Sequence, residues 1–380
     1  MRALNPRLDI DLAAICANYR RMASAAPRAD AGAVVKCDAY GLGAESVGRA
    51  LHRMEKCRTF FVAYSEEGEA LRKAIGPDAE IFVFNGPIDE SLLSYRTHAL
   101  TPVLNTVGQA ALWCKEMGGA PAALHIDTGM NRLGLAPDDI AEIRSMKGLA
   151  ITVAMSHLSC ASDALHPMND RQHRIFTEIA KLFPDARRSL ASSGGAILST
   201  DYAFDMVRIG VGLYGVNPQD NSPNPLEAVA SLTAPVIHLH DIDRGESVGY
   251  GASFVAEKPM RLATVLLGYG DGYPRAASNR GAAFLCGSLC PIVGRVSMDL
   301  IVLDASAVAA PLSIGDRAEF FGRDHSIDRA ADACGTIGYE LLTGVGGLAR
   351  PRKGLGGRVH RRYLWNGAPA PEDLAGVEGN

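Results

Sequence analysis

From the N-terminus to about residue 215, short apolar runs alternate with amphipathic segments. In residues 43–56, Val47 and Leu51 recur at helical spacing, which predicts an amphipathic helix. Residues 65–75 predict another helix, with Ser65 as its N-cap. Several apolar runs are apolar at every position, as parallel strands covered by helices on both faces are. The runs that predict strands are 33–38, 59–64, 80–86, 100–104, 122–127, 151–158, 187–194 and 205–215.

Eight alternating strand–helix units predict an α/β fold, a (β/α)8 barrel of the TIM type. A doubly wound parallel sheet is the alternative. The pattern changes at residues 216–228, which are rich in Pro, Asn and Asp and predict a linker. Beyond it, period-2 stretches punctuated by glycine and proline predict a mainly β domain. We expect a barrel at residues 8–218 and a mainly β C-terminal domain at 226–368, with residues 1–7 packed on the latter.

Composition narrows the class of protein. Hydrophobic residues make up 47% of the chain and charged residues 21%, so the chain can build a full core. A net charge of −4 gives no broad basic surface, and we expect no nucleic-acid partner. The N-terminal segment lacks the features of a signal peptide, and no apolar run is long enough to span a membrane. We therefore expect a cytoplasmic protein without a membrane partner.

The 8 cysteines are scattered and contain no CxxC pair. This spacing is typical of free thiols in a reducing compartment and not of zinc ligands or a disulfide framework. We expect no metal site.

Lys36 is the first residue that suggests chemistry. It follows apolar residues and precedes a glycine-containing loop, so we expect it at the C-terminal end of the first barrel strand, where barrel enzymes place functional groups. The ordinary explanation is a lysine that reaches the solvent. The functional one is a partly desolvated amine that forms a Schiff base with a carbonyl group.

Further polar residues follow the later strands. Arg132 lies in a glycine-rich loop, His157 follows the sixth strand, and Ser193 stands at a Gly-rich turn where a phosphate can meet hydroxyl and N–H groups. Arg208 lies on the eighth strand, with Gly210 two residues on. Each alone has an ordinary explanation, as a surface charge, a half-buried ring or a turn residue. Together they supply the amine, the phosphate-binding turn and the cations that pyridoxal phosphate (PLP) needs.

The motifs make the resemblance specific. They include VVKCDAYGLGA, DTGMNRLG, RIGVGLYG, VGYGASF, GYGDGYPR and VGRVSMD, in one order. The chain resembles the alanine racemases, a PLP-dependent family that pairs a (β/α)8 barrel with a C-terminal β domain. The resemblance runs from residues 10–19 to residues 293–299 and continues more loosely to the end.

The resemblance implies that Lys36 holds PLP covalently and acts as one of two acid–base groups, with Tyr250 as the other. Racemisation needs a proton removed from one face of Cα and returned to the other, and an amine and a phenol on opposite faces meet that demand. Arg208 matches the partner of the pyridine nitrogen, and His157 matches the residue that hydrogen-bonds this arginine. A cation at that nitrogen disfavours its protonation, which favours a racemase over a decarboxylase.

Other positions match binding residues of the family. Tyr40, Ser193 and Gly210 match phosphate-binding positions, and Arg132 matches the arginine that contacts the PLP hydroxyl and the substrate carboxylate. Met298 matches a substrate contact made through its backbone N–H, and Tyr269 matches a tyrosine at the substrate entrance.

In the family, the residues at positions 250, 269 and 298 reach the barrel site of the other subunit. The resemblance therefore implies a homodimer with shared active sites.

Two departures from the family pattern concern the site. His125 stands where many members have a lysine, often carbamylated, that steadies the arginine. Residues 348–357 form an insertion before Arg358, and the family's pocket-narrowing tyrosine is replaced by Gly347 or Gly357. A roomier pocket that accepts serine or larger amino acids follows as a hypothesis. The basic residues of this segment, which we interpret as a solvated loop, are Arg350, Arg352, Lys353, Arg358, Arg361 and Arg362.

The sequence thus predicts a PLP-dependent racemase that interconverts L-alanine and D-alanine, in either D-alanine supply or alanine catabolism. A racemase of broader or serine-preferring specificity is the alternative. A PLP-binding protein without turnover is disfavoured by Tyr250 and by the C-terminal domain.

Overall fold

The computed structural model describes residues 5–220, 222–349 and 358–376. These residues divide into two compact units, which are described separately. The barrel unit contains residues 15–39, 44–220, 222–227 and 372–376. The C-terminal unit contains residues 5–14, 40–43, 228–349 and 358–371.

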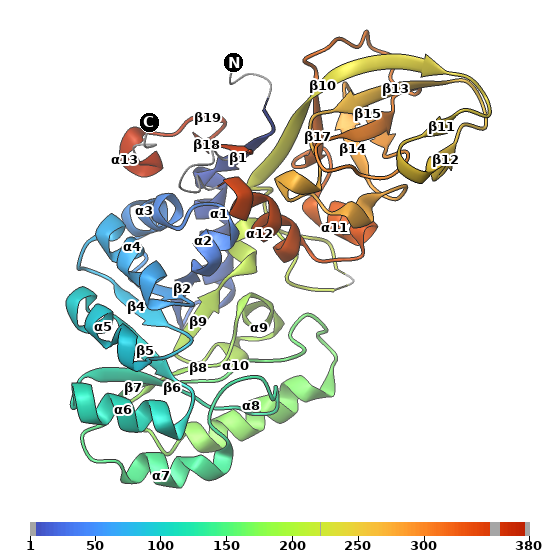
Figure 1. The fold of residues 1–380 in the computed structure, drawn as a ribbon. Helices are drawn as coiled ribbons and strands as arrows, with labels where there is room; N and C mark the ends of the chain where they lie inside the picture. The colour runs from blue at the N-terminus through green and yellow to red at the C-terminus, as the bar shows by residue number, and fades with distance from the viewer. Residues whose placement is uncertain (1–4, 221, 350–357, 377–380) are drawn as a thin grey trace. The chain divides into compact units, whose positions relative to one another are not determined.

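Eight parallel strands form the barrel unit, in the order β8-β7-β6-β5-β4-β3-β2-β9 (Figure 1). The barrel is nearly closed, because the backbone N–H of Arg208 donates to Ala191 O at 3.0 Å and joins the two edges. The predicted (β/α)8 barrel is confirmed, and the doubly wound sheet is wrong. The strands are β2 (Asp30–Val34), β3 (Thr59–Val62), β4 (Glu80–Val83), β5 (Thr101–Leu104), β6 (Pro121–His125), β7 (Ala150–Met155), β8 (Arg187–Ser189) and β9 (Met206–Ile209).

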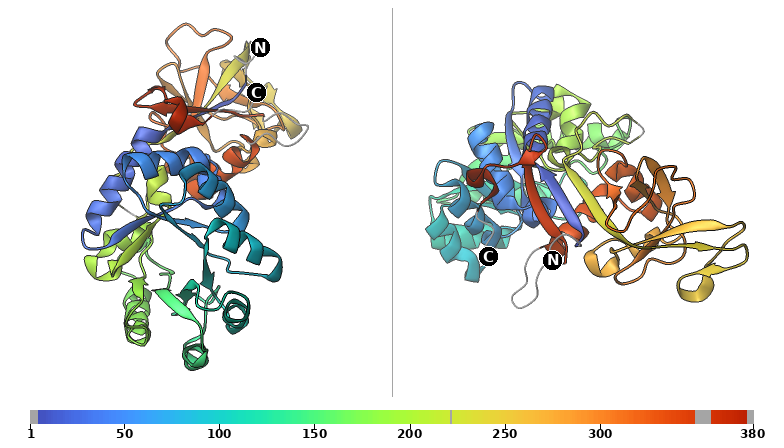
Figure 2. Two further views of the ribbon diagram at one scale, coloured as in Figure 1. Left: turned by 90° about the vertical axis from the view of Figure 1, so that its left-hand side faces the viewer. Right: turned by 90° about the horizontal axis from the view of Figure 1, so that it is seen from above.

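Helices lie outside these strands, as Figure 2 shows. The apolar stripe of α3, with Val47 and Leu51, is fully buried, as its spacing predicts. The helices are α1 (Leu12–Ala25), α3 (Ala44–Met54), α4 (Ser65–Ile75), α5 (Leu92–His98), α6 (Val107–Met117), α7 (Ile140–Ser145), α8 (Pro167–Ala180), α9 (Ser193–Leu198), α10 (Thr200–Ala203) and α13 (Glu372–Ala375). Among the described residues, no helix has both the length and the apolar character that crossing a membrane requires.

The start of α4 differs from the prediction. Its N-cap is Tyr64, and Ser65 is already inside the helix. Glu67, the third residue of the helix, reaches back instead, and its carboxylate accepts from the backbone N–H groups of Tyr64 at 3.4 Å and Ala63 at 2.8 Å.

The C-terminal unit is built on a sheet of mostly antiparallel strands, so the predicted mainly β domain is confirmed. Its long central strand, β10 (Ala230–Ile242), pairs with β1 (Arg7–Asp11), β13 (Met260–Val265) and β17 (Arg317–Phe321). The expected barrel domain began at residue 8, whereas β1 lies in this sheet. The other elements are α11 (Ile327–Cys334), α12 (Gly338–Ala349), β11 (Ser247–Val248), β12 (Phe254–Val255), β14 (Ala282–Leu285), β15 (Ser288–Pro291), β16 (Ile301–Asp304), β18 (His360–Trp365) and β19 (Ala368–Pro369).

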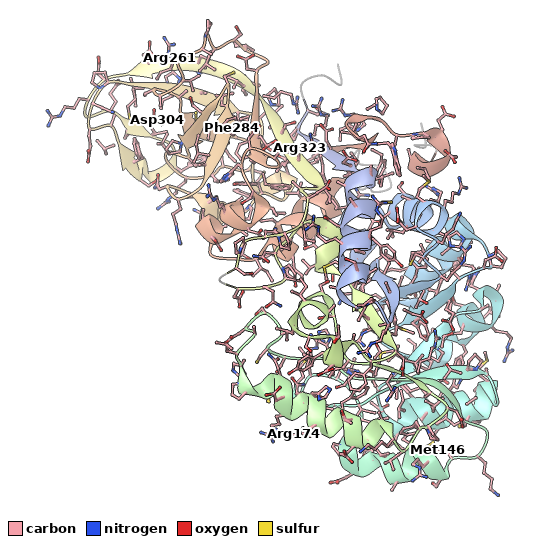
Figure 3. The ribbon with its side chains drawn as sticks, turned by 180° about the vertical axis from the view of Figure 1, so that it is seen from behind. Met146, Arg174, Arg261, Phe284, Asp304 and Arg323 are labelled. Atoms are coloured by element: carbon pink, nitrogen blue, oxygen red, sulfur yellow. The ribbon has the colours of Figure 1, made fainter. Side chains whose placement is uncertain are left out.

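Buried apolar side chains along the strands form the core of this unit. On β13, Met260 and Leu262 are buried and pack with Val248 and Val293. Phe284 of β14, labelled in Figure 3, pairs with Glu319 of β17 and extends the sheet.

The basic segment near the C-terminus is not a solvated loop where the structure describes it. Arg361 and Arg362 lie on β18, which pairs in parallel with β1. Arg362 forms two hydrogen bonds of 2.8 Å with the Asp9 carboxylate, and Arg361 donates to Gly346 O at 2.8 Å. Arg358 binds two carboxylates, as described below. The other members of the predicted cluster, Arg350, Arg352 and Lys353, lie outside the described residues, as does most of the predicted insertion.

Candidate functional site

Lys36 does not end a strand, which corrects the sequence prediction. Strand β2 ends at Val34, and Lys36 begins a short turn, α2 (Lys36–Tyr40). The next four residues have left-handed φ angles of 52° at Cys37, 57° at Asp38, 53° at Ala39 and 55° at Tyr40. This conformation costs about 1–2 kcal/mol per residue for L-amino acids, which normally adopt it one residue at a time. The backbone beside the lysine is therefore strained.

Side chains hold this strained turn in place. The carboxylate of Glu67, on α4, accepts from the Cys37 backbone N–H at 2.7 Å. The Asp38 carboxylate accepts from the Ala44 N–H at 2.9 Å, and the Ala39 N–H donates to Val35 O at 2.8 Å. These bonds fix where the Lys36 side chain starts. Its Nζ lies 5.8 Å from the centroid of the Phe84 ring. Sequence reasoning missed Glu67, whose position on the first turn of a helix gives no sign of a contact 30 residues away.

Arg208 is buried on β9, with 3% of its surface exposed. Its Nη1 donates to Ser189 O at 2.9 Å and to the Ser189 hydroxyl at 2.6 Å, and its Nη2 donates to the carbonyls of Ser156 and Leu190. Burial lowers the pKa of Arg208 to about 10, which leaves the guanidinium charged at neutral pH. Among the described residues, its Nε makes no hydrogen bond, so this N–H can donate to a bound group.

His157 lies beside this guanidinium. Its Nδ1 is 3.4 Å from Arg208 Nη2. Desolvation, followed by the charges of Arg208, Arg132 and Lys36, lowers the pKa of His157 well below its ordinary value. The ring is therefore neutral and accepts from Arg208 through Nδ1. The charges of Arg208, Arg132 and Lys36 therefore all act on the His157 ring.

His125 ends β6 and has a partner that sequence reasoning missed. Its Nδ1 lies 2.8 Å from Asn105 Oδ1. The Asn105 amide nitrogen donates to Phe84 O and Val103 O, which identifies Oδ1 as the acceptor and gives His125 the Nδ1–H tautomer. Desolvation and the charge of Arg208 lower the pKa of His125 to about 4. Asn105 directly follows β5, and the rule that selected the other strand-end residues would have selected it too.

Ser193 and two glycines form a small cradle after β8 and β9. The Ser193 hydroxyl accepts from the backbone N–H groups of Gly210 and Gly212, at 3.0 and 3.1 Å. A Cβ at Gly212 would lie 3.2 Å from this hydroxyl, and one at Gly194 would lie 2.9 Å from Ala161 O. The backbone can approach this closely only because these positions are glycine.

Arg132 lies in the exposed loop that follows β6. The Asp127 carboxylate organises the loop by accepting from the backbone N–H groups of Gly129 and Met130, both at 2.8 Å. The loop returns to His125, whose carbonyl accepts from the Leu135 N–H at 2.9 Å. The Arg132 side chain thus extends from a fixed loop base.

The remaining predicted residues belong to the C-terminal unit. Tyr250, Tyr269 and Met298 are 71%, 41% and 53% exposed. Tyr40 contacts Tyr339, with ring centroids 5.9 Å apart.

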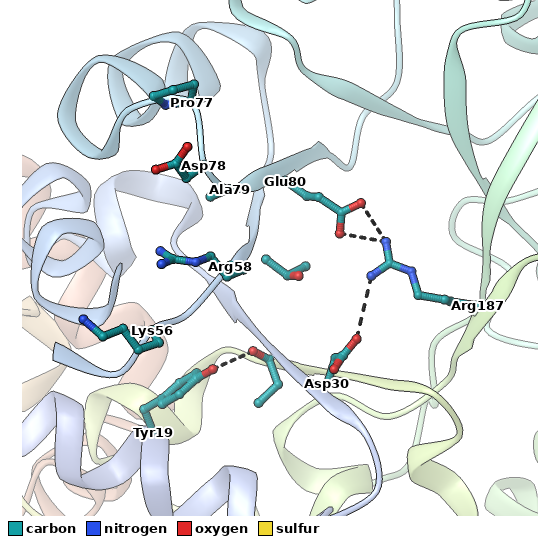
Figure 4. A pocket seen from close by; sticks show the side chains of 11 residues that line it. Tyr19, Asp30, Lys56, Arg58, Pro77, Asp78, Ala79, Glu80 and Arg187 are labelled. Carbon is teal, nitrogen blue, oxygen red and sulfur yellow. Dashed lines mark hydrogen bonds and ion pairs between the residues drawn. The ribbon is translucent and has the colours of Figure 1, made fainter. Parts of the chain in front are cut away.

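A cavity of about 590 Å³ lies elsewhere in the barrel unit (Figure 4). Its lining includes the first residues of four strands, which are Asp30, Thr59, Glu80 and Arg187. It therefore lies at the N-terminal ends of the strands, opposite Lys36, and Arg187 crosses it to bind Glu80 at 2.7 Å. In barrels this face serves stability, and catalytic groups occupy the other end.

Comparison with known proteins decides the family. The alanine racemase N-terminal domain model matches residues 10–218, and the C-terminal domain model matches residues 229–352. The chain belongs to the alanine racemase family. It is 43% identical over 357 residues to the alanine racemase of Methylobacterium sp. (strain 4-46), which covers 91% of this chain and 98% of that protein. It is 44% identical over 349 residues to a catabolic alanine racemase of Agrobacterium fabrum, which covers 89% of each.

A solved alanine racemase from Bartonella henselae, with covalently bound pyridoxal phosphate, superimposes with a TM-score of 0.86. It is 35% identical and covers 95% of this chain and 99% of that one. The resemblance read from the motifs is thereby confirmed.

Proposed function

We propose that this chain is a PLP-dependent racemase that interconverts L-alanine and D-alanine. The observation that carries the proposal is the charged, buried Arg208 beside neutral His157, with its Nε left without a protein acceptor near Lys36. An arginine N–H that has no protein acceptor can donate to a ligand, and a pyridine nitrogen is such an acceptor.

The barrel residues fit PLP. Lys36 would hold it covalently, Arg208 would donate to its ring nitrogen, and Ser193, Gly210 and Tyr40 would hold its phosphate. The Ser193 hydroxyl supports this assignment: it accepts from the Gly210 and Gly212 N–H groups, which leaves its own O–H to donate to a phosphate. When bound, PLP supplies the sink for the electron pair left at Cα.

Two groups of this protein would then move the proton at Cα. The Lys36 amine acts on one face and the Tyr250 hydroxyl on the other, each alternating between acid and base. Arg132 would bind the substrate carboxylate, and a carboxylate is well matched to a guanidinium. His157 would stay neutral and keep Arg208 charged and oriented.

We infer further that the protein is a cytoplasmic homodimer, with a barrel domain that ends near residue 218 and a mainly β C-terminal domain that includes β1 and residues 226–368. We also infer that each barrel receives Tyr250, Tyr269 and Met298 from its partner. These three side chains are exposed, so a second chain can reach them.

A broader amino-acid range is the second candidate. Gly347 stands in one alignment where the family's tyrosine narrows the pocket, and a Cβ there would meet no atom of the described residues within 4 Å. Gly357, the other alignment, lies outside the described residues. Open space at Gly347 favours acceptance of serine beside alanine.

The test is an exchange and chirality assay in D2O. Holoenzyme is offered L-alanine, L-serine, L-lysine and L-arginine separately, and α-deuteration and the D-enantiomer are measured. Exchange and racemisation of alanine alone support the narrow proposal, comparable turnover of serine supports the broader one, and no exchange with any of them refutes both.

Two variants test the roles of the acid–base groups. Lys36→Ala should lose all exchange together with the visible absorbance of bound PLP. Tyr250→Phe should lose racemisation yet retain exchange with one enantiomer, because one of two bases survives. If Tyr250→Phe racemises alanine as well as the parent does, the two-base assignment is wrong.

A further inference from the structure

Two loops of the C-terminal unit carry Tyr269 and Met298, and they are tied together through their backbones. The Tyr269 N–H donates to Ser297 O at 3.1 Å, and the Gly270 N–H donates to Met298 O at 2.8 Å. A Cβ at Gly268 would lie 2.2 Å from Met298 O, so the loops touch closely enough to require glycine.

A buried carboxylate stands inside the first loop. Asp271 is 2% exposed, and one of its oxygens accepts from the Gly268 N–H at 2.9 Å. Burial raises the pKa of Asp271, while the Gly268 N–H and the charge of Arg358 oppose the rise. A buried carboxylate is costly without a cationic or hydrogen-bonding partner.

Arg358 is that partner, and it reaches both loops. Its Nε donates to Asp271 Oδ1 at 2.8 Å, and its Nη2 donates to Asp299, the residue after Met298. Its Nη1 packs against Gly270, where a Cβ would lie 2.9 Å away. One guanidinium therefore connects the buried carboxylate of one loop to the exposed carboxylate of the other, in the forked geometry that arginine alone provides.

The base of this arginine is itself fixed. The neighbouring Val359 is buried, and His360 begins β18 with its N–H donating to Pro6 O at 2.9 Å. Arg358 thus connects a paired strand to two loops that have little regular structure of their own.

We propose that Arg358 is a positioning residue that clamps the Tyr269 and Met298 loops so that both reach the substrate together. The inference rests on the proposed function, in which these two residues contact substrate. It adds a residue that touches neither substrate nor PLP but sets the geometry of the groups that do.

The experiment compares Arg358→Gln and Arg358→Lys with Arg362→Gln in the holoenzyme. Arg362 is a matched control, because its side chain is 43% exposed against 46% for Arg358 and it binds Asp9 in the same sheet. Arg358→Gln should raise the KM for L-alanine about tenfold, the ratio expected for one lost charge-assisted hydrogen bond, with a smaller change in kcat. Arg358→Lys should recover part of the loss, since an ammonium lacks the fork.

The absorbance of bound PLP should be the same in all three variants, because the bonds that Arg358 makes to Asp271 and Asp299 lie within the C-terminal unit. An unchanged KM in Arg358→Gln overturns the proposal, and so does an equal rise in Arg362→Gln. Asp299→Asn guards against misfolding of the arginine variant, because it leaves the buried Asp271–Arg358 pair intact; it should raise KM in the same direction.

Hydrogen exchange separates this inference from the proposed function. Peptides that contain the Gly268 and Gly270 amides should exchange faster in Arg358→Gln than in the parent, and not in Arg362→Gln. If the parent racemises no amino acid, the proposed function fails. The role of Arg358 as a clamp is still tested, because it depends only on whether these peptides exchange faster in Arg358→Gln than in the parent. Equal exchange in Arg358→Gln and the parent refutes the clamp.

Discussion

The neutral His125 should make the protein lose stability in acid. Its pKa is about 4 in the folded chain, against an ordinary value of 6.5. As the pH falls below 6.5, the unfolded chain binds a proton that the folded chain does not, so stability is lost from there down to about 4. The loss for this one group is about 2 kcal/mol at pH 5 and about 3 kcal/mol below pH 4.

His125→Gln isolates this contribution, because glutamine can donate to Asn105 Oδ1 but does not titrate. His157 has a lowered pKa as well and adds to the acid loss of the parent, so the difference between variant and parent is the useful quantity. The holoenzyme is unfolded by urea at about pH 7.5 and about pH 5, and the change in that difference is measured.

We expect the variant to gain about 2 kcal/mol relative to the parent between the two pH values. Thr128→Ser is the control. Thr128 is buried, and its hydroxyl lies 2.8 Å from the hydroxyl of Ser156. Neither threonine nor serine titrates in this pH range. Its difference from the parent should be the same at both pH values. If His125→Gln behaves as this control does, His125 is not held neutral and the assignment of its tautomer fails.

Two other predictions concern the barrel. Glu67→Gln should lower kcat and weaken PLP retention, measured by visible absorbance, because one amide oxygen cannot accept from both Cys37 and Ala63; Glu66→Gln, in the same helical turn, should leave both unchanged. Arg187→Gln changes the cavity at the N-terminal ends of the strands. It should cost at most about 1 kcal/mol of unfolding free energy, because the ion pairs of Arg187 are partly exposed. Turnover should be unchanged, because Lys36 lies at the other end of the strands. A loss of activity in Arg187→Gln would contradict the structural role of that end.

The fold was largely predictable from the sequence. Most barrel strands are short apolar runs, with β8 the exception, and helices such as α3 have an amphipathic period, so local pattern was sufficient for most elements. Strand ends were less predictable: β8 ends at Ser189, whereas the apolar run suggested a strand to residue 194, because hydrogen-bond pairing decides where a strand stops.

Candidate site residues could be selected from the sequence where they lie in recognisable motifs, as Arg208 on its strand and Ser193 at its turn do. The motifs could not reveal the strained backbone beside Lys36. A left-handed run of L-residues has no propensity signature, and it persists only because Glu67 and Asp38 bind its amides.

By itself the sequence determined the elements, their order and the chemical groups available to the site, because periodicity and residue type are properties of the chain alone. Tertiary structure decided which groups meet. Asn105 sets the tautomer of His125, and Arg362 binds Asp9 across 353 residues instead of lying in a solvated loop. Arg358 likewise joins two loops that are 87 and 59 residues away. Such contacts depend on how strands are paired and which charges are buried together, and neither is written in local pattern.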